Sequence, residues 1–256
     1  MRFHNKVALI TGAGSGIGLS TARRFADEQA TVIAAILEEN QRDQVSDFDV
    51  VMLDVRSEEM WGRAIAHVEN TYGGLDVLVS NAGIHRRATA EQTSYELWSE
   101  VMDVNAWGTV LGCKKVVPLM RKRGGGAIVN LSSINASAGV PNMLAYNASK
   151  GAIKTLTMSL AMELVGDNIR VNCVCPGAVD TPIVNKILDE AQDRNAALEM
   201  TVAKHPVGRL ANPVEIASVI AFLASDDASF MTGLESPLMV AEACDHKGLG
   251  SYELDS

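Results

Sequence analysis

Tyr146 and Lys150 stand four residues apart in a segment whose apolar residues recur at helical spacing. Positions i and i+4 lie on one face of a helix, so the phenol and the ammonium point to the same side. A neighbouring positive charge favours the phenolate, and we expect it to lower the pKa of the tyrosine below its usual value of about 10. A phenol tuned in this way can donate a proton to an oxygen atom or accept one from it.

Ser133 is a second polar side chain whose placement suits such chemistry. It follows an apolar run, residues 127–131, that is predicted to be a buried strand, so it lies on the rim where open parallel sheets bind ligands. From there a hydroxyl can donate a hydrogen bond to the oxygen of a reacting alcohol or carbonyl. A serine after a strand and a Tyr-Lys pair on a helix are each ordinary structural features, so the assignment depends on their surroundings.

A glycine-rich turn, residues 11–18 with the sequence TGAGSGIG, lies near the N-terminus. It falls between a predicted strand, residues 7–10, and a predicted helix, residues 17–28. Glycines there let backbone amides approach a pyrophosphate, and the helix N-terminus adds unpaired N–H groups and a partial positive charge. Strand, turn and helix in this order indicate a dinucleotide site. The glycine spacing is G-x-x-x-G-x-G, which differs from the more common G-x-G-x-x-G.

The elements that must position these residues alternate along the chain. Apolar runs that read as buried strands cover residues 7–10, 32–37, 50–53, 77–79, 127–131 and 169–174, with a weaker one near 238–240. Segments with helical spacing cover residues 17–28, 57–72, 95–122, 144–165 and 213–224. This alternation predicts an α/β fold with a single doubly wound parallel sheet of the Rossmann type and helices on both faces. We expect one domain over residues 1–256, of which residues 240–256 form an atypical C-terminal tail.

The composition narrows the kinds of partner. A formal net charge of −9 gives no positive field to attract phosphate, which argues against nucleic acid and anionic membranes. No apolar run approaches the roughly 18 residues of a membrane span, and a strand pattern begins at residue 7, so no signal peptide is expected. The four cysteines include no Cys-x-x-Cys pair and read as reduced thiols of a cytoplasmic protein. No other residue is spaced to join His205 in a metal site.

Together these features resemble the motifs of the short-chain dehydrogenase/reductase family. Further matches, in the family's order over about residues 5–235, are Asp54, Asn81-Ala82-Gly83, Asn105 and Pro176-Gly177. The resemblance implies a nicotinamide-dependent enzyme that moves a hydride between its cofactor and the carbon of a small secondary alcohol or ketone. It also implies the catalytic set Asn105, Ser133, Tyr146 and Lys150.

The resemblance assigns roles to these residues. Tyr146 exchanges the proton of the substrate oxygen, and the family's thirteen-residue spacing selects Ser133 over Ser132 as the residue that holds this oxygen. Lys150 holds the nicotinamide ribose, and Asn105 anchors a water that relays protons to it. Asp54 contacts the adenine, and Val179 and Thr181 hold the carboxamide. The expected cofactor-binding residues are Gly12, Ser15, Gly16, Ile17, Gly18, Ile36, Asp54, Val55, Asn81, Ala82, Gly83, Tyr146, Lys150, Pro176, Gly177, Val179 and Thr181.

The choice of cofactor depends on a departure from the family at the end of the second predicted strand. NAD-preferring members carry an aspartate there for the adenosine ribose, whereas this chain has Ile36. No lysine or arginine lies in the glycine-rich turn to receive the 2′-phosphate of NADP, and the nearest base after the strand is Arg42. Glu38 and Glu39 would repel that phosphate. We therefore expect NAD to be preferred over NADP, with weak recognition of the ribose.

The sequence leaves the substrate open. The loop Ile84-His85-Arg86-Arg87 could meet a polyol or an anion, or it could simply face water. Asn135 is a candidate for the pocket wall, and residues 183–205, with Leu198 and Met200, are expected to form a lid. A small secondary alcohol of the polyol, diol or sugar type is favoured. The alternatives are an NADPH-dependent reductase of 3-oxoacyl thioesters and, from another class, a non-catalytic nucleotide sensor that kept the fold.

The helix predicted at residues 144–165 also bears on assembly. Its apolar residues are Ile153, Leu156, Met158, Leu160, Met162 and Leu164. This is more apolar surface than one sheet face can cover, unless the helix is an ordinary core helix. Because the family pairs its long helices between subunits, the resemblance implies a homo-oligomer, and we expect a homotetramer.

Overall fold

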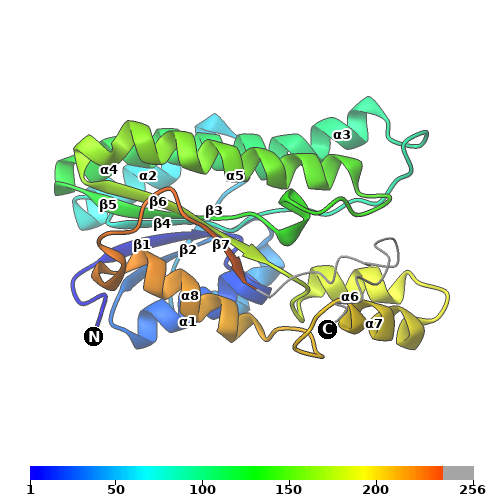
Figure 1. Ribbon diagram of the computed structural model, residues 1–256. Helices are drawn as coiled ribbons and strands as arrows, with labels where there is room; N and C mark the ends of the chain where they lie inside the picture. Colours follow the sequence, from blue (N-terminus) through cyan, green and yellow to red (C-terminus); the bar gives the residue numbers. More distant parts are fainter. Residues whose placement is uncertain (239–256) are drawn as a thin grey trace, which may run out of the picture.

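The computed structural model describes residues 1–238, which form one parallel sheet with helices on both faces (Figure 1). The strands are β1 (Val7–Thr11), β2 (Thr31–Ile36), β3 (Asp49–Met52), β4 (Val77–Ser80), β5 (Gly126–Leu131), β6 (Ile169–Pro176) and β7 (Glu235–Leu238). They pair in the order β3-β2-β1-β4-β5-β6-β7, and every neighbouring pair is parallel. The predicted doubly wound α/β fold is confirmed.

The strand order reverses between β1 and β4, because the chain winds outward from β1 in one direction and from β4 in the other. Such a reversal leaves a crevice at the carboxyl ends of the strands, where open parallel sheets bind ligands. The glycine-rich turn follows β1, Asn81 follows β4, Ser133 comes two residues after β5, and Gly177 follows β6. The topology therefore brings the predicted site residues to one edge of the sheet.

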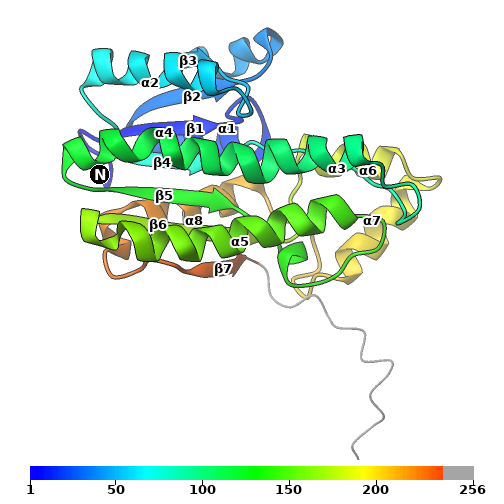
Figure 2. The ribbon, with the colours of Figure 1, turned by 90° about the horizontal axis from the view of Figure 1, so that it is seen from above.

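Two layers of helices cover the sheet. One face carries α1 (Gly16–Asp27) and α8 (Pro213–Ala224), and the other carries α2 (Glu58–Tyr72), α4 (Gly108–Arg123) and α5 (Leu144–Leu164). The helix α3 (Tyr95–Met102) continues into α4 through a π-helical turn, Asp103–Trp107. Beyond the carboxyl ends of the strands lie α6 (Pro182–Asp189) and α7 (Arg194–Ala203) (Figure 2). Short 3-10 helices cover Glu39–Val45, Ile134–Ala136, Val165–Asp167 and Asp226–Ala228.

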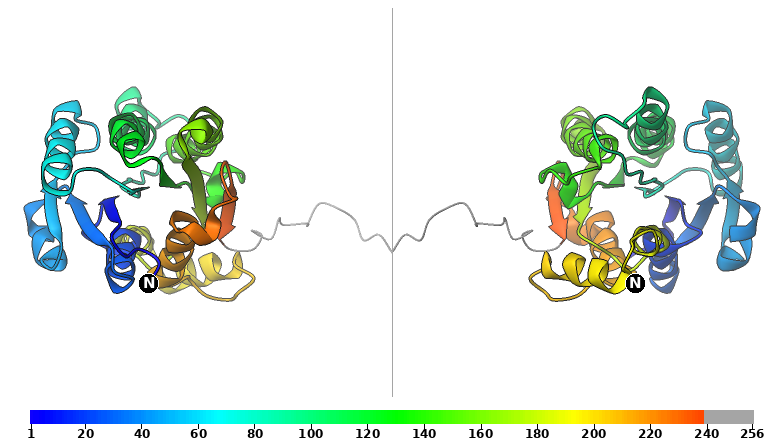
Figure 3. Two further views of the ribbon diagram at one scale, coloured as in Figure 1. Left: turned by 90° about the vertical axis from the view of Figure 1, so that its left-hand side faces the viewer. Right: turned by 90° about the vertical axis from the view of Figure 1, so that its right-hand side faces the viewer.

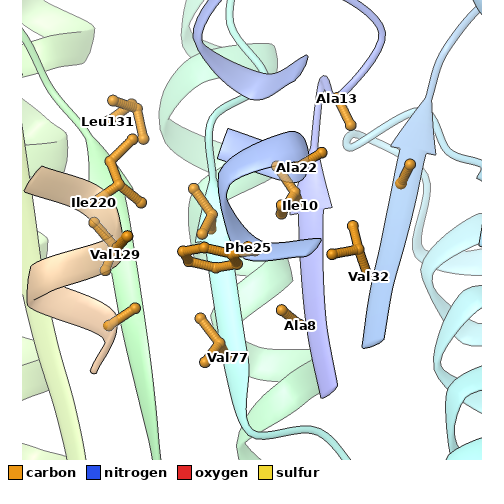
Figure 4. Packing of buried hydrophobic residues seen from close by; sticks show 14 of the residues in the cluster. Ala8, Ile10, Ala13, Ala22, Phe25, Val32, Val77, Val129, Leu131 and Ile220 are labelled. Carbon is orange, nitrogen blue, oxygen red and sulfur yellow. The ribbon is translucent and has the colours of Figure 1, made fainter. Parts of the chain in front are cut away.

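The sheet is buried on both faces, as Figure 3 shows along the strands. Alternate residues of β1 therefore serve two cores: Ala8 and Ile10 pack on the side of α1 and α8, and Leu9 packs on the opposite side. Phe25 of α1 lies at the centre of the first core, fully buried and 4.4 Å from the ring of Phe3 (Figure 4). Burial on both faces explains why the strands read as continuous apolar runs.

The first six predicted strands agree with the structure to within two residues at either end, but the last does not. The strand expected near residues 238–240 begins at Glu235, and its residues 239–240 lie outside the described residues, as does the predicted tail at 240–256. No helix within residues 1–238 is long and apolar enough to cross a membrane. The same residues contain no cluster of three or more His, Cys, Asp or Glu suited to a metal ion.

Candidate active site

A pocket of about 350 Å³ opens at the carboxyl ends of the strands, in the crevice between β1 and β4. Most of the predicted cofactor-binding and catalytic residues line it, namely Gly12, Ser15, Gly16, Ile17, Asp54, Val55, Asn81, Ala82, Gly83, Ser133, Tyr146, Lys150, Pro176, Gly177, Val179 and Thr181. Three predicted residues, Gly18, Ile36 and Asn105, do not line it. The structure thus brings together residues that the sequence spreads over most of the chain.

The glycine-rich turn has the backbone that a phosphate site needs. Gly12 and Gly16 have φ of 64° and 54°, in the left-handed region that favours glycine. A Cβ atom on Gly18 would lie 2.2 Å from the carbonyl oxygen of Gly12, so a side chain there would force the turn and the helix apart. Ser15 precedes α1 without capping it through its side chain, and the first turn of α1 has no acidic residue. The N–H groups at this helix end remain free to bind an anion.

Asn81, just after β4, holds this turn from the neighbouring strand. Its Nδ2 donates to the carbonyl oxygens of Thr11 and Gly12 at 2.9 and 3.1 Å, and its own N–H donates to the Thr11 hydroxyl at 3.0 Å. The side chain therefore fixes the shape of the turn, while Ala82 and Gly83 continue along the pocket wall. Asn81 is therefore placed at least as well to shape the glycine-rich turn as to contact a cofactor directly.

Tyr146 and Lys150 face the pocket from one side of α5, as their spacing predicts. The Lys150 Nζ atom lies 5.6 Å from the centroid of the Tyr146 ring. Burial raises the pKa of Tyr146, and the nearby Ser133 hydroxyl acts in the opposite direction without reversing the shift. The pKa of Tyr146 in the protein alone is therefore raised, contrary to the expected lowering, because removal of the phenol from water has the largest effect.

Lys150 is itself an unusual lysine. Its side chain is only 5% exposed, and its Nζ donates to the carbonyl oxygen of Leu131, at the end of β5, over 2.7 Å. Burial lowers the pKa of Lys150 from 10.5 to about 8. The amine therefore stays mostly charged near neutral pH but can lose its proton readily, which suits a group that exchanges protons with a neighbouring acid.

Asn105 lies behind the pocket in the π-helical turn and is fully buried. Its Oδ1 accepts the N–H of Ile84 at 2.8 Å, and its Nδ2 donates to the carbonyl oxygen of Ile84 and to the Ser149 hydroxyl, each at 3.0 Å. These protein partners occupy both ends of the amide. Asn105 therefore fastens the loop after β4 to α5. A Cβ atom on Gly83 would lie 3.2 Å from the Asn105 Oδ1 atom and 3.6 Å from the Lys150 Nζ atom, so the amide oxygen and the ammonium border the same space. The amide oxygen can accept a second hydrogen bond, and its role in anchoring a water for Lys150 stays a prediction.

The adenosine end of the pocket differs from the expectation at Ile36. The Ile36 side chain is fully buried in the core, and Leu37 lines the pocket in its place. Gln41, from the 3-10 helix after β2, also lines the pocket; its side chain packs over Gly14, and its Oε1 accepts the N–H of Leu37 at 3.3 Å. Gln41 was not predicted, because the 3-10 helix that carries it has no clear periodicity in the sequence.

Two arginines near this end are already paired with carboxylates. Arg56 lines the pocket, and its Nη2 lies 2.7 Å from Oδ2 of Asp54, which holds the pKa of the Asp54 carboxyl below its usual value. Arg42 forms an ion pair with Glu39 and does not line the pocket. The base that the sequence singled out is thus turned away, and the base that does reach the pocket, Arg56, was not identified.

The loop after β4 contributes an imidazole to the site. The ring of His85 packs against the ring of Tyr146, with centroids 4.9 Å apart, and burial together with nearby Arg87 lowers the pKa of His85 to about 4. Arg86 is turned away and pairs with Glu100 at 2.6 Å. His85 is therefore neutral near pH 7, and the loop is less basic at the site than its sequence suggests.

The lid prediction is partly met. Residues 183–205 cover all of α6 but its first residue, together with α7, and of these residues only Ile183 and Val184 reach the pocket, next to Pro182. Met200 is 67% exposed, and neither it nor Leu198 lines the pocket. Asn135 is also absent from the lining, and its N–H donates to the Ser133 hydroxyl at 3.2 Å. The start of α6 thus adds apolar side chains to the pocket lining.

Comparisons with known proteins agree with this geometry. A profile described as enoyl-(acyl carrier protein) reductase matches residues 12–237. The chain is 40% identical to a 3-oxoacyl-[acyl-carrier-protein] reductase of Thermotoga maritima, over 91% of this chain and 96% of that protein. It is 38% identical to a cyclopentanol dehydrogenase of Comamonas testosteroni, over 91% and 95%. The solved structure of an aldohexose dehydrogenase from Thermoplasma acidophilum superposes with a TM-score of 0.86, at 35% identity over 92% of each chain.

Proposed function

The chain belongs to the short-chain dehydrogenase/reductase family, and from this premise we propose that Ser133, Tyr146 and Lys150 carry its reaction. It is a nicotinamide-dependent oxidoreductase that acts on CH–OH groups of small secondary alcohols. The observation that carries the residue assignment is the meeting of these three side chains in one pocket behind the glycine-rich turn. The uncapped start of α1 and the tight turn that Gly18 permits fit a pyrophosphate-linked cofactor.

In the proposed mechanism the substrate oxygen lies between the hydroxyls of Ser133 and Tyr146. The nicotinamide cofactor supplies or accepts the hydride. When an alcohol is oxidised, the Tyr146 phenolate takes the hydroxyl proton, and Ser133 donates a hydrogen bond that holds the oxygen. Lys150 is buried beside Tyr146, so its ammonium stabilises the phenolate. Lys150 also passes on the proton that Tyr146 has taken from the alcohol. In the reverse direction the same phenol protonates the alkoxide.

For the substrate we favour a small polyol, diol or sugar-type alcohol. Relatives of this chain include dehydrogenases of cyclopentanol and cyclohexanol, and the structural relative is an aldohexose dehydrogenase. The pocket lining has a matching character, because it combines the apolar side chains of Ile84 and Ile183 with the hydroxyls of Ser133 and Tyr146. A compact ring or chain with one reacting hydroxyl suits such a wall.

A second candidate function is the reduction of 3-oxoacyl thioesters, because the Thermotoga relative has that activity. A carrier-protein substrate would favour a basic entrance for its phosphopantetheine arm. In this chain, however, Arg86 is paired with Glu100 and the overall charge is −9. We therefore rank the alcohol dehydrogenase first.

We also propose NAD as the preferred cofactor. At the adenosine end the pocket presents apolar Leu37 and the amide of Gln41, which can hydrogen-bond a ribose hydroxyl. The guanidinium of Arg56 is bound by Asp54, and that of Arg42 is bound by Glu39. The 2′-phosphate of NADP would have to draw one of these cations from its carboxylate, at a cost in free energy that NAD avoids. If NADP is preferred instead, Arg56→Gln should abolish that preference.

A homotetramer in the cytoplasm remains our proposal for assembly and location. On α5, Ile153 and Leu164 are buried within the chain, whereas Met162 is 79% and Met158 is 42% exposed. These outward methionines support a helix pairing between subunits. The buried free thiols Cys113, Cys173 and Cys175 support a reducing compartment.

One screen tests the proposed function. Purified protein is assayed with NAD and with NADP against cyclopentanol, cyclohexanol, vicinal diols and aldohexoses, and in the reverse direction against a 3-oxoacyl thioester. We expect turnover of at least one alcohol with NAD, and its loss in Ser133→Ala but not in Ser132→Ala. Turnover of the thioester alone would favour the second candidate, and no turnover of any substrate would contradict both.

A further inference from the structure

The lid leaves the sheet and returns to it at nearly the same place. After β6 the chain runs along the pocket through Gly177, Val179 and Thr181. It then forms α6 and α7 (Figures 1 and 2) and returns at His205, which accepts a hydrogen bond from Ala178. Thr181 lies directly over the phosphate turn, because a Cβ atom on Gly16 would be 3.2 Å from its Cγ2. A shift of this loop would therefore displace both the lid and the glycine-rich turn.

His205 closes this loop with two hydrogen bonds. Its Nε2 accepts the backbone N–H of Ala178 at 2.8 Å, across 27 residues of chain, and its Nδ1 lies 2.7 Å from the carbonyl oxygen of Thr201 in α7. The side chain is 5% exposed. Because a backbone N–H can only donate and a carbonyl can only accept, the imidazole must be neutral with its proton on Nδ1. Both ring nitrogens are therefore used by the protein.

The backbone of Ala211 also holds this loop, through two further hydrogen bonds. Its N–H donates to the carbonyl oxygen of Ala178 at 3.0 Å, and its carbonyl oxygen accepts the N–H of Asp180 at 2.9 Å. The main chain of Ala178 is thus held by His205 at its N–H and by Ala211 at its carbonyl. Of these two contacts, only the one through His205 involves α7 and depends on a side chain.

We propose that His205 is a positioning residue that ties α7 to the pocket-lining loop of residues 177–181, so that the lid and the cofactor site move as one unit. The proposal rests on the proposed function in one respect, namely that Val179 and Thr181 hold the nicotinamide end of the cofactor. His205 touches neither substrate nor cofactor and acts through Ala178. The sequence suggested a plain loop residue, because the neighbouring Pro206 marks a turn and nothing local reports a partner 27 positions away.

The contrasting explanation is that His205 merely fills space in the interior. Three substitutions separate the two explanations. His205→Gln keeps an acceptor at the reach of Nε2, so the bond to Ala178 can form. His205→Asn keeps a polar group only near the position of Nδ1, and His205→Phe keeps the ring volume without either bond. A filling role ranks the variants by volume and favours Phe, whereas a positioning role favours Gln.

The measurement is equilibrium binding of NADH compared with binding of AMP, which contains only the adenosine half of the cofactor. We expect the Asn and Phe variants to bind NADH about tenfold more weakly, as the loss of one buried hydrogen bond allows, with AMP affinity unchanged. His205→Gln should recover most of the NADH affinity. In turnover assays the Asn and Phe variants should show a raised KM for the cofactor and a smaller change in kcat.

Several results would overturn the proposal. These are NADH affinity equal to the wild type in the Phe variant, a parallel loss of NADH and AMP binding together with a lower Tm, or better retention by Phe than by Gln. Because binding is measured without turnover, the proposal can fail or hold independently of the reaction. A wild type that binds NADH but oxidises no alcohol would contradict the proposed function alone, and one that binds no NADH would contradict both.

Discussion

Replacing Lys150 with methionine should stabilise the cofactor-free protein while removing its activity. Burial lowers the pKa of Lys150 from 10.5 to about 8. Below pH 8 the buried ammonium therefore lowers the free energy of unfolding by roughly 3 kcal/mol. Methionine has a similar length and no charge. It forfeits the hydrogen bond from Nζ to the Leu131 carbonyl, which costs about 1 kcal/mol. The net expectation is a gain of roughly 2 kcal/mol at pH 7.

The pH dependence gives this prediction its sharpest form. Between pH 8 and 10.5 the unfolded chain keeps a proton on Lys150 that the native protein has lost, so the wild type should gain stability as the pH rises, by up to about 1.4 kcal/mol per pH unit. Lys150→Met should lack this contribution, and its advantage should shrink above pH 8. Urea unfolding at pH 7, 8 and 9.5 measures both curves. A variant that is less stable than the wild type at pH 7, or whose difference does not change with pH, would refute the reasoning.

Further predictions concern the cofactor cradle and the subunit contacts. Leu37→Asp should tighten NAD binding by about tenfold, through a charge-assisted hydrogen bond to the ribose. Ile36→Asp should instead destabilise the fold by several kcal/mol, because that side chain is fully buried. Fluorescence titration measures the affinity for NAD and urea unfolding measures the stability, and the same change of both quantities in the two variants would contradict the different places assigned to Ile36 and Leu37. Gly18→Ala should abolish NADH binding, since its Cβ would lie 2.2 Å from the Gly12 carbonyl oxygen, and unchanged affinity would show that the turn yields. Met162→Glu should shift a tetramer to smaller species in sedimentation, and a wild type that is already monomeric at micromolar concentration would contradict the proposed assembly.

The strands and the catalytic helix could be predicted from the sequence because their signals are local. A parallel strand buried on both faces leaves a run of apolar residues, and Tyr146 and Lys150 share a helix face by spacing alone. The glycine-rich turn was equally readable, since the close approach of Gly18 to the Gly12 carbonyl admits no other residue. The collection of these residues into one pocket then followed from the order of the elements.

The errors arose where the answer depends on tertiary contacts. At the end of β2, Ile36 belongs to the core and Leu37 lines the pocket, and a continuous apolar run does not show which of the two residues takes which place. The sign of the Tyr146 shift was wrong because burial, which the sequence cannot supply, outweighs the neighbouring charge. The hydrogen bonds of Asn105 to Ile84 and Ser149 are a further tertiary feature that the sequence does not report.

The most direct test of the central claim is Tyr146→Phe, measured for turnover and for NADH binding in the same preparation. The substitution removes only the hydroxyl that exchanges a proton with the substrate. The account predicts that kcat falls by about 10²- to 10⁴-fold while the Kd for NADH stays close to that of the wild type. Tyr95→Phe, the same chemical change at a residue that is 78% exposed on α3, is the matched control and should leave both values unchanged. A Tyr146→Phe enzyme that keeps half of the wild-type rate would contradict the account.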